Sequence, residues 1–139
     1  MNTRTIYLIS CVKSKLSYPA KARYLYTSTL FKLSLNYALQ RNPDAIYILS
    51  AKYGLVDLDQ VISPYELTLN TMKEAEKRTW AKKIVNALNK KANLQQDHFV
   101  LIAGNNYRKY LLPKFRYYEV PFEGLPFGKL LSELKRRTS

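Results

Sequence analysis

The side chains best suited to chemistry in this chain are concentrated in residues 49–71, LSAKYGLVDLDQVISPYELTLNT, a stretch rich in glycine, proline, hydroxyls and opposed charges. Two of its carboxylates, Asp57 and Glu66, are our candidates for catalysis. A carboxylate beside a sugar can activate water or stabilise positive charge at the anomeric carbon, as glycosyl-transfer chemistry requires. For each carboxylate the alternative is a loop cap or an ion pair with one of the many lysines.

The remaining polar side chains in and around this stretch suit a nucleobase. Tyrosine rings stack on bases, amides pair with base edges, and lysines hold the neighbouring phosphate. An enzyme of this kind would take its base out of the duplex. We expect base binding by Ser10, Tyr53, Gly54, Tyr65, Asn105 and Tyr107, and phosphate binding by Lys13, Lys15, Lys52 and Arg108.

Other catalytic chemistries have less support. The chain has no P-loop, GxGxxG, HExxH or GxSxG motif. The one histidine, His98, stands at the start of a predicted strand, at the edge opposite the expected site. The one cysteine, Cys11, has lysines nearby that favour a thiolate, but without a histidine partner we interpret it as a small residue at a strand end. We expect no metal and no cofactor.

Apolar runs indicate the elements that position these residues. Four of them are predicted strands: residues 5–10, 45–49, 99–103 and 117–120. Helices are expected between and after them: from Pro19 with a restart at Ser28 to about Gln40, from an N-cap at Thr71 with Glu74 in a capping box to about Lys91, a short one to Leu112, and one over residues 126–137. Residues 50–71 are expected to form one ordered loop lining a site.

This order of elements predicts a single α/β domain over residues 1–139, a Rossmann-like three-layer sandwich with a mostly parallel central sheet. Ligands bind such sheets outside the carboxyl ends of the strands. Gly54, Gly104 and Gly124 each follow a predicted strand, and glycine permits close approach to backbone. We therefore expect these three loops and residues 10–12 to surround one pocket.

The charge of the chain indicates its partner. There are 23 basic and 10 acidic residues, a net charge of +13, and no acid before Asp44. This imbalance favours nucleic acid, DNA over RNA; the alternative is that a small basic protein stays soluble in this way. A membrane surface is disfavoured because no helix pairs a basic face with an apolar aromatic stripe. No signal peptide or membrane-length apolar run is present, and we expect a cytoplasmic protein.

Several motifs resemble known families. LIS before Lys13, LSAKYGL, SPYELTLNT, Trp80 with Ile84, and IAGNNYRKYLLPK are similar, in the same order, to blocks of the YaaA family of bacterial peroxide-stress proteins, over about residues 6–115. A smaller uncharacterised bacterial and phage family with SCxxxK, LYxSxxF, LSAKYGL and PYxxTL is more similar still. The first resemblance implies DNA binding and a role in oxidative stress. The overall pattern also resembles α/β uracil-DNA-glycosylase-like domains.

Three functions follow as hypotheses. The first is a DNA glycosylase-like enzyme that cleaves the N-glycosidic bond of a modified base. The second is a non-catalytic DNA-binding stress-response protein, whose basic faces contact phosphates. The third is a binder of small nucleotides, such as a phage or host-defence component.

Overall fold

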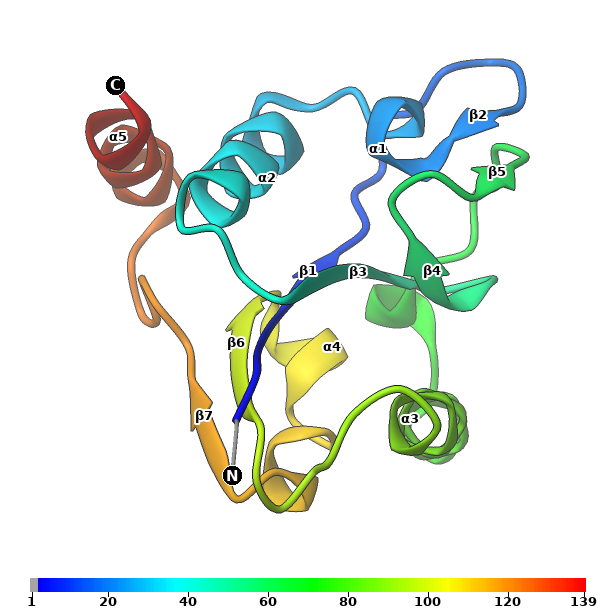
Figure 1. The fold of residues 1–139 in the computed structure, drawn as a ribbon. Helices are drawn as coiled ribbons and strands as arrows, with labels where there is room; N and C mark the ends of the chain where they lie inside the picture. The colour runs from blue at the N-terminus through cyan, green and yellow to red at the C-terminus, as the bar shows by residue number, and fades with distance from the viewer. Residues whose placement is uncertain (1–2) are drawn as a thin grey trace.

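The computed structural model describes residues 3–139 and has a five-stranded sheet at its centre (Figure 1). The strand order is β4-β3-β1-β6-β7. β3, β1, β6 and β7 are parallel, whereas β4 runs antiparallel to β3 at one edge. The predicted mostly parallel sheet is therefore confirmed. The strands are β1 (Thr5–Ser10), β3 (Ala45–Ser50), β4 (Gly54–Asp57), β6 (His98–Ile102) and β7 (Tyr117–Glu119).

Helices cover both faces of this sheet (Figure 1). α2 (Thr29–Gln40) packs with α5 (Phe127–Thr138) on one face, and α3 (Glu74–Asn89) and α4 (Asn105–Arg108) lie on the other. The chain passes from β1 to β3, its neighbour on one side in the sheet. It then returns in the opposite direction, from β3 to β6, the neighbour of β1 on its other side. Because parallel crossovers are right-handed, connections that run in opposite directions place their helices on opposite faces.

The central strand explains why the sheet has two covered faces. Ile6, Leu8 and Ile9 of β1 are all essentially inaccessible to solvent. Leu8 and Ile9 are consecutive and point to opposite faces of the sheet, so β1 is buried on both faces. This is the pattern of a parallel strand between two helical layers. Next to it, Phe99 of β6 stacks on Phe115 with ring centroids 4.1 Å apart. Within residues 3–139 no helix is long and apolar enough to cross a membrane.

Residues 50–71 are not one loop, as we expected. They contain β4, the two-residue strand β5 (Val61–Ile62) and the 3₁₀ helix η1 (Leu69–Thr71). β5 pairs antiparallel with β2 (Ala20–Lys21) in a second, two-stranded sheet. This pairing also corrects the predicted helix start at Pro19, because the following residues are extended and the short helix α1 (Ala22–Leu25) begins only after them.

The predicted cap of the long helix is wrong by two residues. Thr71 belongs to η1, and the extended residue Met72 separates η1 from α3. The N-cap is Lys73 instead, and its backbone N–H donates to Glu76 Oε1 at 3.1 Å, which is the carboxylate half of a capping box. The short helix after β6 is also split, into α4 and the 3₁₀ helix η2 (Leu112–Lys114). The position of His98 as the first residue of β6 is confirmed.

Two glycines allow a test of this backbone. Gly54, the first residue of β4, has φ of +77°, where any side chain is strained, whereas Gly128 lies in the first turn of α5 with open space around it. We expect Gly54→Ala to lower the free energy of unfolding by about 1–2 kcal/mol. Gly128→Ala should raise it by up to about 1 kcal/mol, because alanine favours helix. Urea denaturation measures both, and equal effects of the two changes would contradict the assigned backbone.

Candidate functional site

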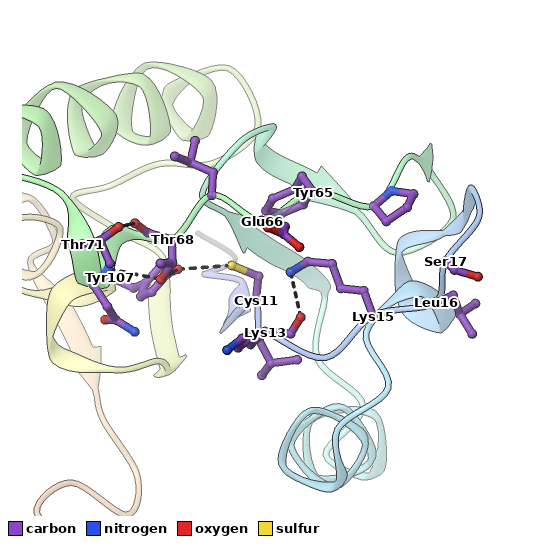
Figure 2. A pocket seen from close by; sticks show the side chains of 14 residues that line it. Cys11, Lys13, Lys15, Leu16, Ser17, Tyr65, Glu66, Thr68, Thr71 and Tyr107 are labelled. Atoms are coloured by element: carbon purple, nitrogen blue, oxygen red, sulfur yellow. Dashed lines mark hydrogen bonds between the residues drawn. The ribbon is translucent and has the colours of Figure 1, made fainter.

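The site lies where the chain connections leave the sheet in opposite directions. β3 lies on one side of β1 and β6 on the other, so a crevice is expected outside the carboxyl ends of β1 and β6. Cys11 follows β1 directly, and Tyr107 lies in α4 after β6. The two meet at this point, with Cys11 Sγ donating to the Tyr107 hydroxyl oxygen at 3.4 Å (Figure 2).

A pocket of about 870 Å³ opens beside this contact, and we call it the switch-point pocket. Its volume falls within the roughly 300–1,000 Å³ typical of small-molecule sites. Two segments and one side chain of α4 form its walls (Figure 2). The lining residues are Cys11, Val12, Lys13, Lys15, Leu16, Ser17, Pro64, Tyr65, Glu66, Leu67, Thr68, Asn70, Thr71 and Tyr107.

The hydroxyl of Tyr107 fixes the hydrogen-bond directions on one wall. It accepts from the thiol of Cys11 and from the backbone N–H of Leu69 at 3.3 Å, which uses both of its lone pairs. Its own proton therefore goes to Thr68 Oγ1, also 3.3 Å away. Thr68 Oγ1 accepts in addition from the N–H of Asn70 at 3.2 Å. Thr68 is itself a lining residue of the pocket, so its hydroxyl can contact a bound ligand.

A second group of hydroxyls supports the same segment at Tyr65. The Tyr65 hydroxyl lies 2.7 Å from both Ser50 Oγ and the Tyr26 hydroxyl, and burial raises the pKa of both tyrosines. Ser50 Oγ accepts from the N–H of Tyr53, and the Ser50 carbonyl accepts from Trp80 Nε1 at 2.9 Å. These contacts tie the end of β3 to α3 and hold the Tyr65 ring at the pocket.

Within residues 3–139, the three charged side chains that line the pocket differ in burial: Lys15 is half-buried, whereas Lys13 and Glu66 are exposed. Lys15 Nζ lies 4.4 Å from the centroid of the Tyr65 ring and donates to the Lys13 carbonyl at 3.1 Å (Figure 2). Burial lowers the pKa of Lys15, and attraction to Cys11 and Glu66 partly opposes this shift. Among the described residues that line the pocket, Glu66 is the one carboxylate.

The structure brings together five of the residues singled out from the sequence: Lys13, Lys15, Tyr65, Glu66 and Tyr107. Ser10 and Arg108 line a smaller pocket of about 240 Å³ against α2. Gly104 and Gly124 line this second pocket too, and Gly54 lines neither, so the expected single ring of glycine loops is wrong. Val12 borders both pockets and separates them.

Arg108 already has protein partners in the smaller pocket. Its guanidinium donates to the Ala103 carbonyl at 2.6 Å and lies 3.4 Å from Glu123. A bound phosphate would have to compete with that carboxylate. Among the described residues, no three histidine, cysteine, aspartate or glutamate side chains are grouped as metal ligands.

Asp57, Lys52, Tyr53 and Asn105 line neither pocket. β4 turns back from the carboxyl edge, so Asp57 pairs with Tyr47 and lies exposed away from the site. The Tyr53 ring packs edge-on against Tyr65 from behind, with centroids 5.5 Å apart, and Lys52 Nζ lies over Tyr53. Asn105 is exposed at the start of α4.

Thr68, Asn70 and Ser50 are among the hydroxyls and amides that the sequence indicates as suited to a nucleobase, but sequence reasoning gave none of them an individual role. It gave Tyr26 and Trp80 no role in the site. The importance of Thr68 and Asn70 depends on a hydrogen bond to Tyr107, 39 positions away from Thr68. No local pattern records such a contact.

The Tyr107 hydroxyl should contribute measurably to stability. Tyr107→Phe leaves the N–H of buried Leu69 and the thiol of Cys11 without their acceptor. We expect a loss of about 1–3 kcal/mol in the free energy of unfolding, measured by urea denaturation. Tyr118→Phe, on an exposed residue of β7, is the control and should be neutral. Equal stability of the two variants would show that the hydroxyl is not held as described.

The same hydroxyl should titrate late. Burial, with the nearby Cys11 thiol adding to it, raises the pKa of Tyr107 from 10.0 to about 12. The unfolded chain therefore loses this proton first, and the stabilisation, complete below about pH 10, is lost as the pH rises through about 12. Tyrosinate absorbance against pH should show an ionisation near pH 12 that Tyr107→Phe removes. Complete tyrosine titration near pH 10 in the folded protein would contradict this.

Comparison with known proteins shows the family but not the activity. A search of the curated proteins finds no match. A family model described as "Family of unknown function (DUF6884)" matches residues 6–136, which include every element from β1 to nearly the end of α5 and both walls of the switch-point pocket. The chain belongs to the DUF6884 family.

Proposed function

We propose that this protein acts on nucleic acid, DNA in preference to RNA, by holding one extruded base in the switch-point pocket and hydrolysing its N-glycosidic bond. The observation that supports this best is the composition of that pocket. It combines one carboxylate, Glu66, with the hydroxyl of Thr68 and two lysine ammonium groups. The net charge of +13 favours a polyanionic substrate.

Each group has a part in hydrolysis. Glu66 would stabilise positive charge at the anomeric carbon and take a proton from the attacking water. The water oxygen bonds to that carbon, and the electron pair of the C–N bond leaves with the base. Thr68 would donate a hydrogen bond to the departing base, which leaves as an anion and takes a proton from solvent, while Glu66 returns its proton to solvent. Lys13, an exposed lining residue of the pocket, would hold a flanking phosphate. The products are a free base and an abasic strand.

The geometry of the fold supports the same proposal. With the antiparallel edge strand set aside, the parallel strands have the order β3-β1-β6-β7, in which the ligand crevice falls between β1 and β6. We propose a Rossmann-like, uracil-DNA-glycosylase-like assignment on this ground. An enzyme that acts on bacterial or phage DNA would work in the cytoplasm.

Replacing the pocket carboxylate tests the function. Purified protein is incubated with single-stranded and duplex oligonucleotides that carry native and modified bases, and released bases and strand integrity are measured by mass spectrometry. We expect Glu66→Gln to abolish base release and to leave DNA affinity nearly unchanged. Asp57→Asn is the matched control, because Asp57 is an exposed carboxylate outside the pocket, and it should retain full activity.

Other outcomes separate the alternatives. Salt-sensitive DNA binding with no base released across the whole panel would favour a non-catalytic DNA-binding protein. Tight binding of a free nucleotide without DNA affinity would favour a nucleotide binder. Loss of activity in Asp57→Asn but not in Glu66→Gln would place the chemistry outside the switch-point pocket.

A further inference from the structure

A basic segment leads out of the switch-point pocket. Residues 13–21, KSKLSYPAK, contain three lysines, one tyrosine and no acid. The segment begins in the pocket wall with Lys13 and Lys15 and ends in β2 (Figure 1). Ser17 is its last residue in the pocket lining, and Tyr18 comes next along the chain.

Tyr18, which follows the last pocket-lining residue of this segment, has an exposed aromatic ring. Its side chain is 58% exposed, and within the described residues it makes no side-chain hydrogen bond or ring contact. Pro19 follows it and restricts its backbone to extended conformations. The ring is therefore presented to solvent from a stiffened segment, which reduces the entropy lost when something stacks on it.

The lysines of this segment are not neutralised by the protein. Within residues 3–139, none of Lys13, Lys15 and Lys21 forms an ion pair. Arg23, two residues further on, differs in this respect, since its Nε lies 2.8 Å from Asp59. The segment from Lys13 to Lys21 thus has positive charge available for a partner.

We propose that residues 13–21 bind a single strand of nucleic acid beside the pocket, with the base next to the target stacked on Tyr18 and phosphates held by Lys13 and Lys21. This rests on the proposed function, whose pocket receives the target base. Stacking on a side chain requires an unpaired base face, which a single strand offers and a closed duplex does not. A lipid surface would need a wider apolar face than one tyrosine between lysines.

Fluorescence anisotropy of the full chain with a fluorescein-labelled dT20 strand, and with a 20-base-pair duplex of mixed sequence, tests this inference. We expect dT20 to bind more tightly than the duplex. Tyr18→Ala should weaken dT20 binding about fivefold or more, whereas Tyr18→Phe, which keeps the ring, should bind as the natural protein does. Tyr118→Ala is the matched control, because Tyr118 is 46% exposed on the far edge of the sheet.

Two results would overturn the inference: a Tyr18→Ala variant that binds dT20 as tightly as the natural protein, or equal weakening by Tyr118→Ala. Binding to anionic vesicles that depends on Tyr18, without dT20 binding, would replace nucleic acid by a lipid surface. Failure of the proposed function is distinguishable from these. Tyr18-dependent dT20 binding without base release would refute hydrolysis alone, and base release that Tyr18→Ala leaves unchanged would refute only the strand-binding segment.

Discussion

The hydroxyl of Tyr107 is the contact on which the geometry of the site depends. It joins the residue after β1, the start of η1 and the helix after β6, three segments separated by up to 96 positions. α4 supplies this oxygen, and Cys11, Thr68 and Leu69 each share one hydrogen bond with it, so the three segments are positioned together. The aromatic ring that carries this hydroxyl is in turn held edge-on by Trp80, with centroids 5.6 Å apart. The position of Thr68 in the pocket wall therefore depends on packing in the core.

The lysines on one wall of the pocket, Lys13 and Lys15, form no ion pair within the described residues. Glu74 is shared between the Tyr110 hydroxyl, Lys109 and Lys77, which together hold the pKa of this carboxyl near 2. Glu133 is shared in the same way between Arg136 and Arg137 in α5. Glu74 and Glu133 are thus paired with basic residues close to them. Within residues 3–139, the lysines of residues 13–21 form no ion pair with any acid. Repulsion among these unpaired lysines opposes folding. Such a cost is expected for a surface that binds a polyanion, as we propose for this segment.

The sequence predicts the sheet well, because each central strand is a continuous apolar run and the helices between them have clear spacing. It also predicts which edge bears the site, since this follows from strand direction alone. The short elements were missed for a physical reason. β2 and β5 are two residues long and exist only because they pair with each other, so neither has a pattern of its own. The N-cap at Lys73 was missed because lysine is not a preferred N-cap residue, whereas threonine, which stands at position 71, is one.

Non-local strand pairing also distinguishes the two candidate carboxylates, Asp57 and Glu66. Asp57 and Glu66 lie nine positions apart in one polar stretch, and nothing local distinguishes them. The hairpin from β3 to β4 carries Asp57 away from the carboxyl edge, and the pairing of β5 with β2 then brings the chain back, so that Pro64–Thr68 face Cys11 across the pocket. The choice of Glu66 thus depends on a two-residue strand pairing. Because that pairing also fixes Lys21 beside Val61, the segment we assign to strand binding and the carboxylate we assign to catalysis are positioned by one contact.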